Sequence, residues 1–230
     1  FMSQKMKIVA AKEAIKYVKN NMKLGLGTGS TVDEFLKLLS VEVKNGLNIL
    51  GVVTSEKTKV LSESLRIPLT TLSDVKDLDL TIDGADEVDP DLSLIKGGGG
   101  ALLREKIIAY NSKELIIIAD KTKLVSKLGD FMIPVEVSPY EHEATSSRIM
   151  QKLDEIGYNG SIKLRQYEGD IFVTDGGNFI YDISIGLVGE PYIIEQLLNS
   201  IPGVFENGLF INLTTKVIIG NENAVDVIER

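Results

Sequence analysis

The chain of 230 residues contains no cysteine and one histidine, His142. Without cysteine there is no disulfide framework, no thiolate nucleophile and no cysteine-ligated metal. A histidine-based metal cluster or a Ser-His-Asp triad would depend on His142 alone, and we expect neither. The sequence therefore predicts no metal site.

Long basic and long apolar runs are also missing. The net charge is −8 at pH 7, which argues against nucleic acid as a partner. No apolar run reaches 18 residues, and the opening FMSQKMK has no apolar signal core. We therefore expect no membrane partner, a soluble cytoplasmic protein, and Met2 as its natural start. The length suits one large domain or two modest ones.

Candidate functional side chains are most concentrated in residues 81–106, TIDGADEVDPDLSLIKGGGGALLREK. Asp83 and Asp86 occupy a turn, Lys96 precedes four glycines, and a predicted helix over 101–111 carries Glu105. Four glycines are poor material for a helix or a strand, but they let backbone N–H groups approach a ligand. The following helix N-terminus favours an anion. The alternative is a flexible surface loop with solvated charges.

A second turn, GLGTGST at 25–31, follows a predicted strand and precedes a predicted helix. Gly27 and Gly29 allow close approach, while Thr28, Ser30 and Thr31 offer hydroxyl groups, an arrangement that suits a phosphate. The turn is neither G-x-G-x-x-G nor a P-loop, so a dinucleotide site is disfavoured. The alternative is a plain strand–helix turn in which Ser30 or Thr31 caps the helix.

Strands and helices alternate through the first half of the chain. Expected strands are 49–53, 67–72, 78–82, 92–95 and 114–120, and expected helices include 4–19 and 56–65. This alternation predicts an α/β fold with a largely parallel sheet covered on both faces. GTGST, DGAD, KGGGG and ADKTK all follow strands, so they are expected at one sheet edge. In ADKTK, one of the two lysines, Lys121 or Lys123, could reach a phosphate; a solvated strand end is the alternative.

The pattern changes after residue 130. A strand over 131–137 contains Pro134, which indicates an edge or a crossing point. A helix over 141–156, strands at 162–166, 171–174 and 179–183, a DGGN hairpin turn at 175–178, a helix over 192–199 and a strand over 208–213 are expected. Apart from one extra strand, this is a β-α-β-β-α-β order, and it predicts a smaller α+β (ferredoxin-like) domain over 131–213, serving as a lid, an oligomer interface or both. Residues 1–130 and 214–230, including a last strand at 217–219, would form the catalytic domain.

The motifs GLGTGST, TIDGADEVD, IKGGGGALLREK and ADKTK, in this order and spacing, resemble the A-type ribose-5-phosphate isomerases. The resemblance runs from about Lys5 to Gly220 and includes GLFIN near the end. It implies a Rossmann-like domain with a smaller α+β domain. It also implies interconversion of D-ribose 5-phosphate and D-ribulose 5-phosphate through an enediol(ate) in the pentose phosphate pathway. No cofactor or metal is implied, and the expected assembly is a homodimer or homotetramer.

The resemblance also implies roles for residues. Glu105 is the expected base for proton transfer between adjacent carbons. Asp83, Asp86 and Lys96 are assigned jointly to ring opening, hydroxyl proton shuttling and oxyanion stabilisation. The remaining substrate-binding residues are Thr28, Gly29, Ser30, Thr31, Gly84, Ala85, Gly97, Gly98, Gly99 and Lys123, with Lys7 as a weaker candidate. A helix N-terminus would lower the pKa of the Glu105 carboxyl and burial would raise it.

Other readings remain open. A sugar-phosphate sensor would keep the phosphate loop without needing Glu105, but such modules usually carry a DNA-binding segment, and none is visible. An amino-sugar-phosphate deaminase is disfavoured by the single histidine and the intact KGGGGALLREK. A nicotinamide dehydrogenase is the least favoured of these alternatives, and failure of the protein to bind NAD(H) would exclude it.

Overall fold

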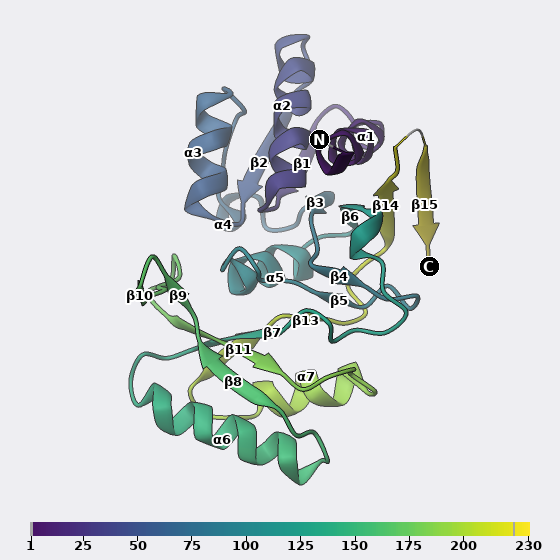
Figure 1. Cartoon of the computed structure of the whole chain (residues 1–230). Helices are drawn as coiled ribbons and strands as arrows, with labels where there is room; N and C mark the ends of the chain where they lie inside the picture. Colours follow the sequence, from purple (N-terminus) through teal and green to yellow (C-terminus); the bar gives the residue numbers. More distant parts are fainter. Residues whose placement is uncertain (1, 223) are drawn as a thin grey trace. The chain divides into compact units, whose positions relative to one another are not determined.

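The computed structural model describes residues 2–222 and 224–230 (Figure 1). The chain divides into two compact units. Unit 1 contains the residues up to 85 together with 104–124 and 212–230, and unit 2 contains 86–103 and 125–211. In the part of the chain that is described, no helix is long and apolar enough to cross a membrane.

Unit 1 is built on a six-stranded sheet in the order β15-β14-β6-β3-β1-β2. Its strands are β1 (Met22–Leu26), β2 (Ile49–Val53), β3 (Leu80–Asp83), β6 (Leu115–Asp120), β14 (Lys216–Gly220) and β15 (Val225–Glu229). All neighbouring pairs are parallel except β14–β15, which is antiparallel. The predicted α/β fold with a largely parallel sheet is confirmed. The antiparallel edge strand β15 was not predicted.

Helices cover the sheet because its strands are apolar on both faces. They are α1 (Met2–Ile15), α2 (Ser30–Lys44), α3 (Glu56–Ser64), α4 (Leu72–Val75), α5 (Leu102–Tyr110) and the 3₁₀ turn η1 (Lys121–Lys123). Leu24 and Leu26 of β1 belong to one core with Phe35 of α2. Between them, Gly25 faces the opposite side, where Ile108 of α5 packs against its backbone.

The sheet order places a topological switch between β1 and β3. From β1 the chain moves outward to β2, and it then returns to the other side of β1 to form β3. The loops that leave the carboxyl ends of β1 and β3 therefore diverge, and such a crevice is where ligands bind in open α/β sheets.

Unit 2 contains an antiparallel sheet in the order β12-β7-β11-β8. Its elements have the order β-α-β-β-α-β: β7 (Ile133–Val137), α6 (His142–Glu155), β8 (Ser161–Leu164), β11 (Phe179–Ser184), α7 (Pro191–Asn199) and β12 (Val204–Asn207). The last strand, β12, precedes the strand expected over 208–213, which is reduced to Leu209–Phe210 in another sheet. A two-stranded hairpin, β9 (Gln166–Tyr167) with β10 (Asp170–Ile171), is inserted before β11. A small sheet joins β4 (Glu87–Val88), β5 (Leu94–Ile95) and β13 (Leu209–Phe210).

Two further strand predictions need correction. Pro134 does not mark an edge, because β7 lies between β12 and β11 in the sheet. It is tolerated there because β12 pairs with residues 135–137 only, so the missing N–H falls where that pairing ends. The strand expected over 67–72 is reduced to a single bridge between Leu69 and Gly51, and α4 starts at Leu72.

The boundary between the units also differs from the predicted domain division. The prediction placed residues 86–103 with the larger domain, whereas they cluster with 125–211 in unit 2. The reason is β-pairing: β5 pairs with both β4 and β13.

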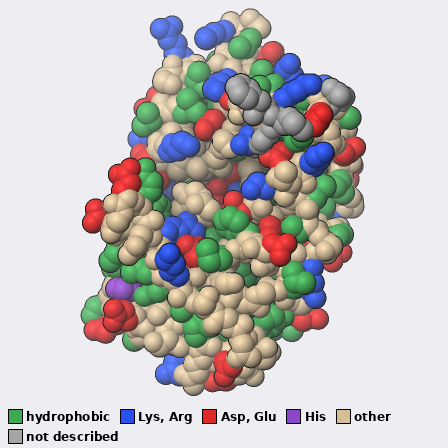
Figure 2. Space-filling model, viewed as in Figure 1, with side chains coloured by type: hydrophobic (Ala, Val, Ile, Leu, Met, Phe, Trp, Pro, Cys, Tyr) green, Lys and Arg blue, Asp and Glu red, His purple; other side chains and the backbone are tan. Residues whose placement is uncertain are grey.

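On the face drawn in Figure 2, acidic and basic side chains are interspersed and do not form a large basic patch.

Candidate active site

The loop at 25–31, here called the anion loop, leads from β1 into α2. Gly29 is the N-cap of α2, with φ 127°, and no side chain caps the helix. The alternative in which Ser30 or Thr31 is the N-cap is therefore wrong. An N-terminus without a side-chain cap leaves its first N–H groups to a ligand, and the helix dipole favours an anion there. The ammonium of Lys7 donates to the Ser30 hydroxyl over 2.9 Å, which adds positive charge.

A cluster of hydroxyl groups fixes the middle of this loop. The Thr28 hydroxyl lies 2.7 Å from that of Thr54, 2.8 Å from that of Ser55 and 3.1 Å from that of Thr58. Thr58 in turn donates to the carbonyl of Gly27 over 2.8 Å. Sequence reasoning missed Thr54, Ser55 and Thr58, although the TSEK run directly after a predicted strand was the available signal.

Asp83 ends β3 and is 1% exposed. Its Oδ1 accepts the backbone N–H of Thr28 over 3.1 Å and that of Gly84 over 2.7 Å. A Cβ on Gly27 would lie 2.1 Å from Oδ1, so only glycine leaves room for this carboxylate. Asp83 therefore joins the two diverging loops across the switch point, a structural role that the sequence did not indicate.

Glu105 lies on α5 and is 4% exposed, so it is not a surface helix acid. The carbonyl of Asn111, just past the end of α5, accepts the N–H of Leu78, just before β3. The C-terminal end of α5 therefore lies beside the start of β3, and its N-terminal turns lie toward the carboxyl ends of the strands. Ile108 packs at Gly25 in the middle of β1, and Glu105 lies one turn nearer the N-terminus of α5 on the same helical face. That spacing directs Glu105 toward the edge where the anion loop and Asp83 lie.

Lys123 lies on η1, directly after β6. Asp120 is 3% exposed and caps this turn by accepting from the N–H of Thr122 over 3.0 Å. Within the described residues, Lys121 and Lys123 make no ion pair, so the strand end is both capped and positively charged. β6 is the neighbour of β3, and the ADKTK segment therefore leaves the same edge of the sheet as Asp83.

In unit 2, the residues at 97–100 form a turn, here called the glycine loop, in which the N–H of Gly100 donates to the carbonyl of Gly97 over 3.0 Å. The N–H of Gly98 donates to Asp86 Oδ2 over 2.8 Å. A Cβ on Gly98 would lie 2.8 Å from Asp86 Oδ1. Asp86 thus caps the glycine loop, while Gly98 and Gly99 remain exposed.

Lys96 immediately precedes the glycine loop and is 2% exposed. Its N–H donates to the carbonyl of Gly208 over 2.8 Å, and its ammonium lies 5.5 Å from the centre of the Phe210 ring. Lysine is rarely buried to this extent, so its position here is specified by the surrounding fold.

The structure thus sorts the predicted residues into two groups. In unit 1 the anion loop, Asp83 and Lys123 follow strands at the carboxyl edge of the sheet, Gly84 and Ala85 continue from Asp83, and Glu105 lies on the turn of α5 nearest that edge. In unit 2 the structure brings together Asp86, Lys96 and the glycines at 97–99. The chain passes from one group to the other between Ala85 and Asp86, and returns between Leu103 and Arg104.

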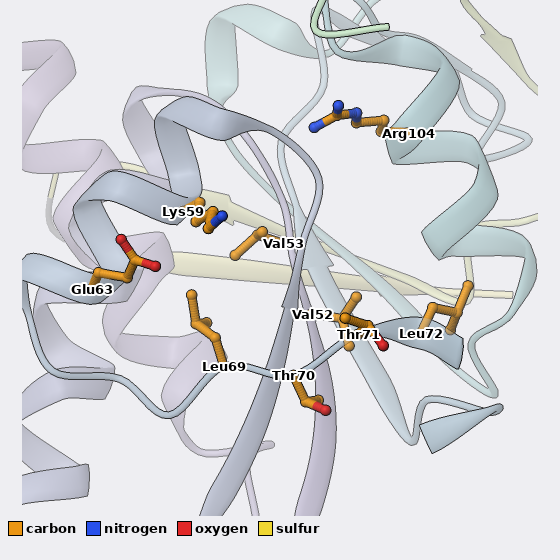
Figure 3. A pocket seen from close by; sticks show the side chains of 9 residues that line it. All are labelled: Val52, Val53, Lys59, Glu63, Leu69, Thr70, Thr71, Leu72 and Arg104. Carbon is orange, nitrogen blue, oxygen red and sulfur yellow. The ribbon is translucent and has the colours of Figure 1, made fainter. Parts of the chain in front are cut away.

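A pocket of about 450 Å³ in unit 1 contains none of the predicted residues (Figure 3). It is lined by Val52, Val53, Lys59, Glu63, Leu69, Thr70, Thr71, Leu72 and Arg104. Arg104 is engaged by Glu56 over 2.9 Å, and the hydrogen bond from Arg104 lowers the pKa of the Glu56 carboxyl. With its arginine already paired, this pocket suits a sugar phosphate less well than the anion loop does.

Over residues 2–222 and 224–230, no group of three or more His, Cys, Asp or Glu side chains is placed to hold a metal ion. The acids of the two groups are instead engaged by backbone N–H groups, as Asp83 and Asp86 show.

Comparison with known proteins gives consistent matches over nearly the whole chain. Residues 50–224 match the family model described as ribose 5-phosphate isomerase A (phosphoriboisomerase A). Ribose-5-phosphate isomerase A of Nitrobacter hamburgensis is 49% identical over 96% of this chain and 96% of its own length. That of Brucella suis is 49% identical over 99% and 98%.

Solved structures agree with these matches. A D-ribose-5-phosphate isomerase in complex with phospho-erythronic acid is 41% identical, with a TM-score of 0.93 over 100% of both chains. The ribose 5-phosphate isomerase of Plasmodium falciparum is 36% identical, with a TM-score of 0.92 over 98% of both chains.

Proposed function

Because this chain belongs to the ribose 5-phosphate isomerase A family, we propose that the two groups of residues described above carry out its reaction. The chain is an isomerase that interconverts ribose 5-phosphate and ribulose 5-phosphate in the pentose phosphate pathway. The observation that carries our assignment is the burial of Glu105 one helical turn beyond Ile108, toward the carboxyl edge of the sheet.

The anion loop holds the phosphate group of the sugar. Its support is the helix N-terminus at Gly29, the hydroxyls of Ser30 and Thr31, and the ammonium groups of Lys7 and Lys123. Binding of the phosphate, which takes no part in the bond changes, positions the reacting carbons. A relative solved with phospho-erythronic acid, a four-carbon sugar acid phosphate, is consistent with such a substrate.

The proton transfer is assigned to Glu105. Its carboxylate removes the proton from C2 of the open-chain aldose, which leaves an enediolate, and returns the proton to C1. The carbonyl then lies at C2, and one hydroxyl proton has moved from O2 to O1. Burial replaces water around the carboxylate and suits a base that must act near neutral pH.

Asp83, Asp86 and Lys96 serve the oxygens of the sugar. The carboxylates move hydroxyl protons during ring opening and isomerisation, and the Lys96 ammonium stabilises the oxyanion. The N–H groups of the glycine loop at Gly97, Gly98 and Gly99 add neutral donors. Since Oδ1 of Asp83 already holds two backbone N–H groups, Asp83 also keeps the anion loop in place.

The test is isomerase activity on ribose 5-phosphate with EDTA present, for the wild type and for Glu105→Gln. We expect metal-independent turnover in the wild type and a loss of kcat of about 10²- to 10⁴-fold in the variant. Binding of phospho-erythronic acid should persist. Near-normal kcat in Glu105→Gln would refute the assignment of the base, and loss of wild-type activity with EDTA would refute the metal-free mechanism.

We also propose that units 1 and 2 correspond to a Rossmann-like domain and a ferredoxin-like α+β domain, and that the smaller one supplies an oligomer interface. Support comes from α7 and β12, where Tyr192, Ile193 and Phe205 are more than half exposed although apolar. A homodimer or homotetramer should appear in light scattering, and Ile193→Glu should shift the mass toward the monomer. A monomeric wild type would contradict this.

A further inference from the structure

Arg165, between β8 and β9, forms a mostly buried ion pair with Asp182 of β11. The two side chains are 14% and 13% exposed. Nε of Arg165 donates to Asp182 Oδ2 over 2.9 Å, and Nη2 donates to Oδ1. The backbone N–H of Arg165 donates to Ile180 over 2.8 Å, so Asp182 is its diagonal neighbour on the same face. Two parallel bonds of this kind fix the plane of the guanidinium.

The third nitrogen of the same guanidinium reaches the glycine loop. Nη1 of Arg165 lies 2.8 Å from the carbonyl oxygen of Gly97 and 3.3 Å from that of Gly98. In a trans peptide unit the C=O and the N–H point in opposite directions. A guanidinium that holds these two carbonyls therefore turns the N–H groups of Gly98 and Gly99 away from itself.

The opposite side of the first peptide unit is occupied by Asp86. The N–H of Gly98 donates to Asp86 Oδ2 over 2.8 Å, while the carbonyl of the same unit accepts from Arg165. A charged donor on the carbonyl polarises the peptide and strengthens its N–H as a donor. One peptide unit thus connects the buried Arg165–Asp182 pair to an acid of the site.

Phe172, which follows β10, supports the same arrangement. Its ring lies 5.8 Å from the guanidinium carbon of Arg165. A Cβ on Gly100 would lie 2.3 Å from its Cζ, so the ring lies directly against the glycine loop. The β9–β10 hairpin and its flanks therefore place both a cation and an aromatic ring on the loop from one side.

We propose that Arg165, oriented by Asp182, is a positioning residue for the isomerisation. It holds the glycine loop so that the N–H groups of Gly98 and Gly99 serve Asp86 and the enediolate oxygens. The inference depends on the proposed function for Asp86 and the glycine loop, and it adds the residue that sets their geometry. Arg165 acts through backbone carbonyls and does not touch the substrate.

The experiment compares Arg165→Met and Asp182→Asn with Lys152→Met, a control that removes the exposed Lys152–Glu155 pair on α6 of the same unit. For each variant we would measure kcat, KM, the thermal midpoint, and the affinities for inorganic phosphate and for phospho-erythronic acid. The carboxylate of phospho-erythronic acid resembles the two oxygens of an enediolate, whereas phosphate probes the anion loop alone.

For Arg165→Met we expect kcat to fall about 100-fold, as a 1 Å misplacement of catalytic groups does. Affinity for phospho-erythronic acid should fall with it, while phosphate affinity stays within about twofold, since the anion loop is untouched. Asp182→Asn should show the same pattern more weakly, and combining the two changes should add little. Lys152→Met should behave as the wild type.

Arg165→Lys is the second variant, which replaces Arg165→Met in the experiment if the methionine variant does not fold. A lysine restores the charge but cannot bind Asp182 and the glycine carbonyls together, so kcat should stay well below that of the wild type. Full recovery of kcat in Arg165→Lys would overturn the proposal. So would equal losses of phosphate and phospho-erythronic acid affinity in a folded Arg165→Met, because they would indicate general structural damage.

Asp86→Asn separates this inference from the function on which it depends. If Asp86→Asn keeps near-normal kcat, the assignment of Asp86 fails, and the positioning role fails with it. If Asp86→Asn loses kcat while folded Arg165→Met and Asp182→Asn keep it, only the positioning role is overturned.

Discussion

The anion loop of unit 1 and the glycine loop of unit 2 solve the same problem in different ways. Each donates a backbone N–H to an aspartate: Thr28 to Asp83, and Gly98 to Asp86. The anion loop is held by its own Thr28 side chain, whose hydroxyl meets that of Thr54 in the segment after β2, and by the start of a 15-residue helix. The glycine loop has no side chains and is fixed from outside, by Asp86 and Arg165.

This difference fits the two tasks that we propose for the loops. A phosphate group is the same before and after isomerisation, so a rigid site with fixed hydroxyls, cations and helix N–H groups suits it. The sugar oxygens change their charge and protons during the reaction, so donors must lie close without side-chain bulk. The comparison leads us to expect that changes in the glycine loop lower kcat, whereas changes in the anion loop affect KM and stability.

Among the variants that test this comparison, the largest effect is expected for Gly98→Ala. The new Cβ would lie 2.8 Å from Asp86 Oδ1, so Asp86 and the loop must separate. We expect kcat to fall about 100-fold, the loss seen when one oxyanion donor is removed. Steady-state kinetics would show it, with phosphate affinity as the internal control. An unchanged kcat would show that the contact between Asp86 and Gly98 is not used.

Thr28→Val tests whether the hydroxyl cluster holds the anion loop in place. The substitution keeps the shape but removes the hydroxyl shared with Thr54, Ser55 and Thr58. These three hydroxyls would each lose a hydrogen-bond partner, and the loss should lower the free energy of unfolding by about 1–2 kcal/mol. Urea denaturation measures this loss, and KM should rise while kcat changes little. A drop in kcat larger than the rise in KM would remove the distinction between the loops.

Lys123→Ala tests whether the strand end after β6 serves the phosphate. We expect KM to rise about tenfold, an ordinary loss for one charged contact, with kcat nearly unchanged. Lys121→Ala, two residues away on the same 3₁₀ turn, is the matched control and should leave KM unchanged. Equal effects of the two substitutions would point to general attraction of the substrate and not to a contact.

The smallest effect is expected at Asp79, an acid that precedes β3 and contrasts with Asp83 at its end. The Lys113 ammonium donates to it over 2.8 Å and the Lys23 N–H over 2.9 Å, and these bonds lower the pKa of the Asp79 carboxyl. A lowered pKa stabilises the fold above the ordinary pKa near 4, and this stabilisation is lost as pH falls through the folded value.

Asp79→Asn should therefore cost less than about 1 kcal/mol at pH 7, because the pair is exposed. The difference from the wild type should shrink as the pH falls below about 4, and thermal unfolding between pH 3 and pH 7 would show this. Activity at pH 7 should not change. A difference that grows on acidification would contradict the sign of the pKa shift.

Much of the architecture was predictable from local pattern. The alternation of apolar strands with helices predicted the parallel sheet, and the motifs after those strands predicted where Asp83, Thr28 and Lys123 leave it. Long-range pairing was less accessible. The sequence assigned residues 86–103 to the larger domain, but β5 pairs with β13, more than 100 residues later. Pro134 suggested an edge or a crossing point, yet β7 lies between β12 and β11, and proline is tolerated there because the pairing with β12 stops short of it.

The sequence by itself determined the family and named the candidate residues for the site, because short motifs keep their order and spacing along the chain. Only the tertiary structure decided which groups hold those residues in place. Ser55 and Thr58 meet Thr28 because β1 and β2 are neighbours, and Arg165 meets Gly97 because β8 pairs with β11. Such contacts join residues far apart in sequence, and sheet pairing, which no local pattern specifies, brings them within hydrogen-bonding distance.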